Sequence, residues 1–297
     1  MVDSVNSSPA AVPALSGDTH EQAIFDMNSR DSAFVERYGP WAVVTGASEG
    51  IGRAFARRLA SLGLNLVLVA RRKEALSDLA KELNSAYGVD CRVIPADLSD
   101  LDATRRMLES TADLDAGLLV AAAGFGSSGP LLAADLDAQT EMVDLNCTAV
   151  LAQCWYFGRR FAQRGKGGVV LMSSLLAFQG SPLAANYAAT KAYVQSLAEG
   201  LQREWSGRGV DVIASAPGPI ESGFAARADM RMAKALLPDV VAQRTLAALG
   251  RKGTVRPGWL SKFLGWSLAT APRYARVGII GRIMAGMTAH QRSAHGR

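Results

Sequence analysis

The sequence predicts a single α/β domain: a doubly wound parallel sheet of the Rossmann type with helices on both faces. Short apolar runs that indicate buried strands alternate with segments whose apolar residues recur at helical spacing. A glycine-rich turn follows the first strand and leads into a helix, which is the order found in dinucleotide-binding units. A length of 297 residues, with no internal repeat, suits one such domain with a full core.

The expected elements alternate along the chain. Residues 41–46 and 64–70 are the first two apolar strands, and residues 50–62 between them repeat apolar side chains with the period of a helix. Further strands are expected at residues 91–95, 117–122, 167–173, 210–216 and 254–256. Further helices are expected at residues 73–87, 100–112, 137–164, 187–206 and 238–250.

The two ends of the chain differ from this catalytic domain, which is expected to span residues 39–256. Residues 1–38 are rich in Ser, Ala and acidic groups and have little periodicity, so we expect a flexible extension. Residues 257–297 are expected to form a basic amphipathic segment, because large apolar side chains alternate there with Lys and Arg and no acidic residue occurs. Such a segment can cover a pocket, form a subunit interface or contact an anionic membrane surface. A pocket cover or a subunit interface is favoured over membrane contact. Nucleic-acid binding is disfavoured, because the basic residues are dispersed among large apolar ones.

The turn after the first strand reads Thr45-Gly46-Ala47-Ser48-Glu49-Gly50-Ile51-Gly52. Glycines let the backbone turn tightly and approach a pyrophosphate, and the N-terminus of the next helix presents free N–H groups to an anion. The spacing is G-x-x-x-G-x-G, whereas G-x-G-x-x-G is commoner in dinucleotide folds. A plain tight turn is the alternative, but the strand–turn–helix setting favours a phosphate cradle.

Tyr187 and Lys191 lie four residues apart in a predicted helix, and Ser174 and Asn146 precede them. Residues at this spacing share one face of a helix, so an ammonium group can lie beside a phenol. A free tyrosine has a pKa of about 10, and a neighbouring cation lowers the pKa because it stabilises the phenolate. A tyrosine and a lysine at this spacing usually lie on an ordinary solvent-exposed face of a helix. The independent glycine motif favours a site of proton transfer instead.

Together these motifs resemble the short-chain dehydrogenase/reductase family over residues 39–256. The resemblance implies hydride transfer without a metal, with Tyr187 as acid or base and Ser174 holding the substrate oxygen. It also implies that Lys191 hydrogen-bonds the nicotinamide ribose and that Asn146 holds a water linking Lys191 to solvent. The family's nucleotide contacts fall on Thr45, Gly46, Ser48, Glu49, Gly50, Ile51, Gly52, Asp97, Leu98, Ala123, Gly124, Tyr187, Lys191, Pro217, Gly218, Ile220 and Ser222.

Cofactor preference is indicated by Arg71 and Arg72, which follow the second strand. NAD enzymes place a carboxylate at this edge for the ribose 2′-hydroxyl, whereas a 2′-phosphate favours cations. An arginine donates two parallel hydrogen bonds to a phosphate. The arginines can alternatively begin a solvated helix, and Glu49 in the glycine turn slightly weakens the case. The sequence favours NADP(H) over NAD(H).

One departure from the family occurs after the fourth strand, where Ala121-Ala122-Ala123-Gly124 replaces the usual Asn-Asn-Ala-Gly. Asparagine side chains there normally hydrogen-bond the backbone, so their loss is expected to cost about 1 kcal/mol per bond. Gly124 still lets the backbone lie against the cofactor. We expect a change in stability and not a loss of activity.

Cysteine and histidine usage excludes other classes of site. Three scattered cysteines, Cys91, Cys147 and Cys154, indicate reduced thiols in a cytoplasmic protein and no disulfide framework. His20, His290 and His295 lie near the termini, which argues against a Ser-His-Asp hydrolase and against a histidine-ligated metal. No secretory signal or membrane-spanning apolar stretch is evident. The expected location is cytoplasmic, with peripheral membrane contact as an open alternative.

The expected substrate is a bulky apolar ketone or alcohol, such as an acyl, steroid or aromatic compound. Residues 125–132 and 175–178 offer apolar surface without a titratable group, and residues 222–236 fall where family members carry a mobile lid. The Phe-Gly-x-x-Gly-Pro stretch resembles the branch with 17β-hydroxysteroid and long-chain 3-ketoacyl reductases.

The predicted function is therefore an NADP(H)-dependent oxidoreductase. Two alternatives stay open: a catalytically retired NADP-binding scaffold or sensor, and a membrane-surface interaction protein that uses the C-terminal segment. Intact Asn146, Ser174, Tyr187 and Lys191 argue against the retired scaffold. Because the family often dimerises through its two long helices, a homodimer or tetramer is expected.

Overall fold

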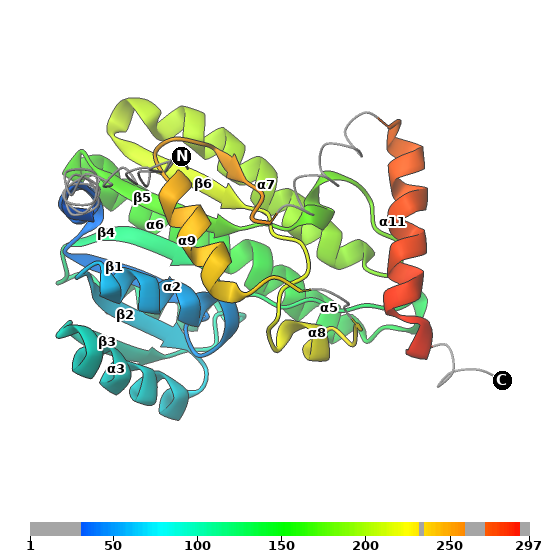
Figure 1. Ribbon diagram of the computed structural model, residues 1–297, viewed down its shortest axis with the longest axis horizontal. Coiled ribbons are helices and arrows are strands. Elements are labelled where there is room, and N and C mark those ends of the chain that lie inside the picture. The colour runs from blue at the N-terminus through cyan, green and yellow to red at the C-terminus, as the bar shows by residue number, and fades with distance from the viewer. Residues whose placement is uncertain (1–30, 232–234, 259–270, 292–297) are drawn as a thin grey trace, which may run out of the picture.

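The computed structural model describes residues 31–231, 235–258 and 271–291, and it contains the doubly wound sheet that the sequence predicts (Figure 1). All strand pairs are parallel, in the order β3-β2-β1-β4-β5-β6-β7. The chain moves outward from β1 to β3, then crosses back to β4 and moves outward again. The order thus reverses between β1 and β4, where open α/β sheets bind ligands. The strands are Trp41–Thr45 (β1), Asn65–Ala70 (β2), Cys91–Pro95 (β3), Ala116–Ala121 (β4), Gly167–Met172 (β5), Val210–Ser215 (β6) and Thr254–Val255 (β7).

Helices cover both faces of the sheet. One face carries α2 (Gly50–Ser61), α3 (Lys73–Tyr87) and α9 (Pro238–Ala248). The other carries α4 (Leu101–Glu109), α6 (Ala149–Arg164) and α7 (Ala185–Trp205). Three further helices lie near the carboxyl ends of the strands: α5 (Leu136–Val143), α8 (Phe224–Arg227) and α11 (Arg273–Met287).

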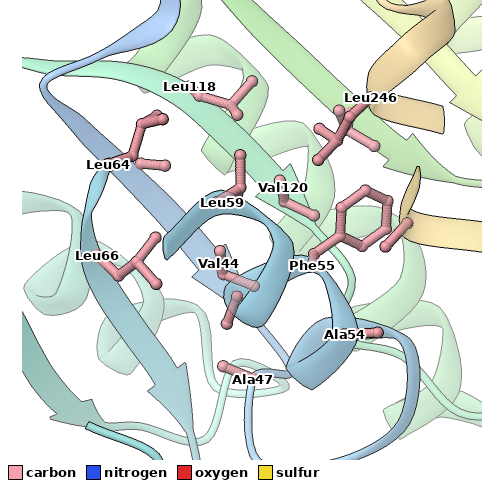
Figure 2. Packing of buried hydrophobic residues seen from close by; sticks show 14 of the residues in the cluster. Val44, Ala47, Ala54, Phe55, Leu59, Leu64, Leu66, Leu118, Val120 and Leu246 are labelled. Carbon is pink, nitrogen blue, oxygen red and sulfur yellow. The ribbon is translucent and has the colours of Figure 1, made fainter. Parts of the chain in front are cut away.

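Successive strand residues point to opposite faces of the sheet. Val44 packs in the core cluster beneath α2, α3 and α9, whereas Val43 belongs to the cluster beneath α4, α6 and α7. Figure 2 shows the first cluster, in which Phe55 and Leu59 of α2 pack toward Val44 and Val120 of the sheet. Because both faces are buried, the inner strands β1, β4 and β5 are nearly continuous apolar runs.

The expected helix over residues 137–164 is not uniform. A π-helical segment, Asp144–Thr148, separates α5 from α6. A π-helical turn places one additional residue in the helical path, which alters the direction of the side chains that follow. The buried Asn146 lies in this segment.

The expected flexible extension is wrong for its last eight residues, because residues 31–38 are helical. Phe34 and Val35 pack against the core, and Tyr38 is buried. The Tyr38 hydroxyl donates to Asp211 Oδ2 at 2.7 Å. Burial and the neighbouring Asp211 carboxylate raise the pKa of Tyr38. Residues 1–30 lie outside the described part of the chain.

The C-terminal segment includes α11, a helix that the sequence analysis does not predict. Ile280 and Met284 of α11 are buried in a third apolar cluster, together with Phe125, Met142 and Tyr187. Residues 259–270 and 292–297 of the expected amphipathic segment lie outside the described residues. Within the described residues, no helix has the length and apolar character needed to cross a bilayer.

Candidate nucleotide and substrate site

The carboxyl ends of the strands border a cavity of about 680 Å³. It extends from the glycine turn after β1 to α11. All residues expected to contact the nucleotide line this cavity, with the exception of Thr45. Of the expected catalytic residues, Ser174, Tyr187 and Lys191 line it and Asn146 does not. The structure therefore brings together side chains that are widely separated in the sequence.

The glycine turn has room for backbone alone. Gly46 has a φ of +67°, and a Cβ atom on it would lie 2.8 Å from the backbone nitrogen of Ala123. A Cβ atom on Gly52 would lie 2.2 Å from the carbonyl oxygen of Gly46. Glu49 is the N-cap of α2, and its side chain makes no capping hydrogen bond. The first N–H groups of α2 are consequently available to an anion in the cavity.

Thr45 has a structural position that the resemblance does not predict. It is fully buried, and its Oγ1 accepts a hydrogen bond from the Ala123 nitrogen at 3.2 Å and donates to the Val120 oxygen at 3.5 Å. The Ala122 nitrogen donates to Val120 as well, at 3.1 Å. Thr45 does not line the cavity, and its expected nucleotide contact stays a prediction. Its hydroxyl binds the backbone at the end of β4, where the family's asparagines are replaced by alanines.

The two arginines after β2 lie at the nucleotide end of the cavity and are paired with carboxylates. Arg72 donates to Glu49 Oε2 at 2.6 Å and to Ser48 Oγ at 3.3 Å. Arg71 lies 3.7 Å from Asp97 and 3.8 Å from Glu141. These side chains are about half exposed, so solvent and salt screen the pairs strongly. The arginines can therefore exchange these partners for a phosphate at modest cost.

Asp97 is the acidic residue at the end of β3. Partial burial acts to raise its pKa, but hydrogen bonds from Ser99 and the nearby Arg71 outweigh that effect and leave the pKa below its usual value. Ser99 supplies both its backbone N–H and its hydroxyl, at 3.1 and 2.7 Å from Asp97 Oδ1. Asp97 is thus a fixed, ionised group at the nucleotide end.

Tyr187, Ser174 and Lys191 meet in the middle of the cavity. Ser174 follows β5, and the other two lie one turn apart on the same face of α7. The Lys191 Nζ atom donates to the Met172 carbonyl at 2.9 Å and lies 5.8 Å from the centre of the Tyr187 ring. The predicted side-by-side arrangement of phenol and ammonium is therefore present.

The protonation of this pair differs from the prediction. Burial raises the pKa of Tyr187 to about 12, and a hydrogen bond with Ser174 opposes that rise. Burial lowers the pKa of Lys191 to about 8, and the neighbouring Cys147 opposes that change only slightly. The expected lowering of the tyrosine pKa by Lys191 is absent: desolvation of the phenolate is the largest effect, and the hydrogen bond with Ser174 opposes it.

Asn146 supports the site from behind. Its Nδ2 atom donates to the Phe125 oxygen at 2.9 Å and to Thr190 Oγ1 at 3.0 Å, and its Oδ1 atom accepts from the Phe125 nitrogen at 3.2 Å. A Cβ atom on Gly124 would lie 2.8 Å from this Oδ1 atom and 3.4 Å from Lys191 Nζ. The Asn146 side chain thus fixes the loop after β4 against α7. Asn146 does not line the cavity, and its expected role of holding a water stays a prediction.

The substrate end of the cavity is mainly apolar. Phe224 packs against Tyr187, with ring centres 5.4 Å apart. Residues 125–132 and 175–178 contain no titratable group, but two arginines of the expected lid, Arg227 and Arg231, also line this end. The lining residues here are Phe125, Phe224, Arg227, Met230, Arg231, Ile280, Ile283, Met284 and Met287.

Polar contacts join α11 to the lid and to the loop after β4. The Met287 carbonyl accepts from the Arg231 nitrogen at 3.0 Å. Gln291 Nε2 donates to Ser128 Oγ at 2.9 Å and to the Asp229 carbonyl at 2.8 Å. His290 Nε2 lies 2.8 Å from Asp229 Oδ1. The sequence has no local signal for these contacts, because they join segments far apart in the chain. Residues 232–234 of the expected lid lie outside the described residues.

A metal-binding cluster is absent from the described residues: no three His, Cys, Asp or Glu side chains gather as a metal site requires. The three cysteines are free. The cavity thus presents backbone amides, arginines, a buried phenol and an apolar wall.

Comparison with known proteins agrees with this arrangement. The sequence model of the family described as short chain dehydrogenase matches residues 40–232. The chain belongs to the short-chain dehydrogenase family. This dehydrogenase is therefore an oxidoreductase that acts on CH–OH and C=O groups.

Three proteins illustrate what this dehydrogenase is similar to. It is 34% identical over 233 residues to a 7beta-hydroxysteroid dehydrogenase of Clostridium sardiniense, covering 77% of this chain and 89% of the relative. It is 33% identical over 242 residues to a very-long-chain 3-oxoacyl-CoA reductase of Neurospora crassa, covering 77% and 72%. The solved structure of a short-chain dehydrogenase from Sphingobium yanoikuyae in complex with NADPH is 29% identical, with a TM-score of 0.72 over 78% of this chain and 93% of that one.

Proposed function

We propose that this dehydrogenase uses NADP(H) to interconvert a carbonyl and a secondary alcohol on a bulky apolar substrate. The observation that carries the proposal is the shared cavity. A glycine turn and two arginines line one end, Ser174 and Tyr187 lie in the middle, and an apolar wall lines the other end. When bound, the nicotinamide supplies or accepts the hydride.

In this proposal, Tyr187 moves the proton. Its pKa of about 12 keeps the phenol protonated at neutral pH, so it is ready to donate to a substrate oxygen as a carbonyl is reduced. Ser174 holds that oxygen with its hydroxyl. Lys191 has a pKa of about 8 and is mostly charged at pH 7, and its Nζ atom lies 5.8 Å from the centre of the Tyr187 ring. The hydrogen bond with Ser174 lowers the pKa of Tyr187 and so stabilises the phenolate that proton transfer leaves behind. Asn146 is a positioning residue that fixes Gly124 and Phe125.

The preference for NADP(H) rests on Arg71 and Arg72. Both guanidinium groups lie at the nucleotide end and can hold a 2′-phosphate by charge-assisted hydrogen bonds. Glu49 and Asp97 are the partners that the phosphate would replace. The related structure that contains NADPH supports this choice.

The substrate class rests on the apolar wall and on the relatives. Aromatic, methionine and isoleucine side chains form that wall, and they suit a steroid or a long acyl chain more than a small polar ketone. The names of the two relatives, a hydroxysteroid dehydrogenase and a 3-oxoacyl-CoA reductase, support bulky substrates of these kinds.

A homodimer is part of the same proposal. Leu151 and Trp155 of α6 are exposed beside a groove that α7 also lines. An exposed apolar face on two long helices is suited to pairing with a second copy. Light scattering of the wild type and of Trp155→Ser tests it, since a dimer through this face should dissociate in the variant.

The experiment that tests the function measures oxidation of NADPH with steroid ketones, 3-oxoacyl esters and aromatic ketones. Turnover by the wild type, with loss of turnover in Tyr187→Phe, is the expected result. If the wild type bound NADPH in calorimetry but turned over none of these ketones, the protein would be a retired scaffold and the proposal would be wrong.

A further inference from the structure

The arginines at the substrate end face a different environment from those at the nucleotide end. Arg71 and Arg72 are paired with Asp97 and Glu49, which also line the cavity. Among the described residues, no other acidic side chain lines the cavity. Glu141 does not line the cavity, but it lies 3.8 Å from Arg71 and 4.0 Å from Arg227, so it compensates part of the Arg227 charge. Arg231 is therefore the lid arginine that makes the substrate end cationic as well as apolar, and that combination suits an amphiphile with an anionic group.

Arg231 is the more available of the two lid arginines. Its backbone nitrogen donates to the Met287 carbonyl at 3.0 Å, and the preceding Met230 is buried, so the residue is held against the end of α11. Its guanidinium makes no salt bridge and no side-chain hydrogen bond to any described residue. Asp229 lies two residues earlier and is paired with His290 at 2.8 Å, and the positive charge of Arg231 makes a smaller contribution to lowering the pKa of Asp229.

Arg227 is oriented by two weaker contacts. Its guanidinium carbon lies 4.3 Å from the centre of the Phe125 ring, and its Nη2 atom lies 4.0 Å from Glu141. Stacking on an aromatic face and a long, exposed ion pair both leave hydrogen-bond donors available. Phe125 also packs in the cluster that contains Tyr187. Arg227 is thus a second guanidinium at this end, held by an aromatic ring that packs in the same cluster as the proton donor.

We propose that the substrate carries an anionic group, a carboxylate or a similar anion, which Arg231 binds with Arg227 beside it. The reactive carbonyl then lies at Tyr187, and the apolar body lies along Phe224, Met230 and Met284. An arginine at an exposed position pairs with a carboxylate in two parallel hydrogen bonds without removing it fully from water. This inference rests on the proposed function and narrows its substrate class. A steroid acid and a long-chain oxo acid share the required chemistry.

The test compares each acid with its neutral methyl ester. Wild type, Arg231→Gln, Arg227→Gln and Arg282→Gln are assayed with NADPH on a keto-steroid carboxylic acid, a long-chain oxo acid and both esters. Arg282 is the matched control: it is an exposed arginine of α11 that does not line the cavity, and its replacement changes the net charge equally. The dissociation constant of NADPH is measured for each variant.

The wild type should prefer the acid over its ester by about tenfold in kcat/KM, as one partly exposed charge-assisted contact allows. Arg231→Gln should remove most of that preference, Arg227→Gln part of it and Arg282→Gln none. The preference should also fall as salt rises. If the acid is preferred over its ester only for the steroid, or only for the long-chain compound, that result identifies which of the two substrate classes the cavity accepts.

Equal kcat/KM for acids and esters in the wild type would overturn the inference and leave the proposed function intact. A preference that Arg231→Gln and Arg282→Gln lower equally would also overturn it, since it would reflect net charge. So would weaker NADPH binding in Arg231→Gln with an unchanged preference, because the arginine would then serve the nucleotide. Failure to reduce any ketone would overturn the proposed function itself, and this inference with it.

Discussion

The two ends of the cavity are built in different ways. The nucleotide end is mainly backbone: a turn in which Gly46 and Gly52 leave no space for a Cβ atom, and the first N–H groups of α2. The substrate end is mainly side chains, which come from the loop after β4, the lid and α11. Backbone geometry depends on a few residues close in sequence, so a motif reveals it. A wall of side chains depends on long-range packing, so it emerges only in the folded structure.

The two ends of the cavity should also differ in how well they tolerate substitutions. A backbone cradle fails when one methyl group is added, whereas an apolar wall can repack around a substitution of similar volume. The two ends should therefore respond separately to mutation, except where they meet at Tyr187.

The largest effect is expected at that meeting point. Tyr187→Phe removes only the phenolic oxygen, so turnover should fall by at least about a hundredfold while NADPH binds as before. Steady-state kinetics on a good ketone, with calorimetry for NADPH, measures both. Near-normal turnover would show that another group moves the proton.

The next effect separates the two ends directly. Gly46→Ala should raise the NADPH dissociation constant at least about tenfold and lower the free energy of unfolding by about 1–3 kcal/mol, because the new methyl group meets the Ala123 backbone at positive φ. Met284→Leu at the other end conserves volume, so it should cost less than about 1.5 kcal/mol and leave NADPH binding unchanged. If both variants weakened NADPH binding equally, the ends would not be independent.

Cofactor choice gives a comparable but more selective effect. Replacing Arg71 and Arg72 with glutamine should raise the NADPH dissociation constant about tenfold and change that of NADH little. Arg105→Gln breaks an exposed ion pair with Asp102 away from the cavity and is the matched control. Equal weakening of both cofactors would show that the arginines do not bind the 2′-phosphate.

Removal of residues 257–297 tests the substrate end. Ile280 and Met284 would leave the apolar cluster, so KM for a bulky apolar ketone should rise about fivefold, while NADPH affinity changes little. Sedimentation with anionic vesicles checks the alternative. An unchanged KM together with lost vesicle binding would assign the segment to a membrane surface.

The smallest effect concerns stability and pH. Burial lowers the pKa of Lys191 from 10.5 to about 8, so the folded state binds its proton less tightly than the unfolded state. The stability that this group contributes is therefore fully present above the pKa of the unfolded state, 10.5, and is lost as the pH falls from there through about 8. Relative to Lys191→Met, the wild type should gain about 1 kcal/mol of unfolding free energy between about pH 8 and 9. Urea titrations across that range measure the difference, and parallel curves would contradict the burial of a neutral amine.

Much of the nucleotide end is predictable because its signals are local. The expected helix at residues 73–87 coincides with α3, and the expected strand at 91–95 coincides with β3, since turn residues mark their ends. The positions of Ser174, Tyr187 and Lys191 at the cavity follow from the strand order and helical spacing. Their roles in catalysis stay predictions.

The substrate end was less predictable for physical reasons. In α11, Ile280 and Met284 are buried while Ile279 and Ile283 are partly exposed, so apolar residues occur on more than one side and no single-faced period marks the helix. The π-helical segment Asp144–Thr148 has no distinct residue pattern. The pKa of Tyr187 depends on how much surrounding protein excludes water, which spacing along a helix does not report.

The hydroxyl of Thr45 has a consequence for how this sequence can vary. Here Ala121 and Ala122 have no side-chain donor or acceptor, and the Thr45 hydroxyl on the adjacent strand contacts both Val120 and Ala123. A valine at position 45 keeps the volume of the threonine and removes both hydrogen bonds, so the backbone that leads from β4 to Gly124 depends on this one hydroxyl of the neighbouring strand.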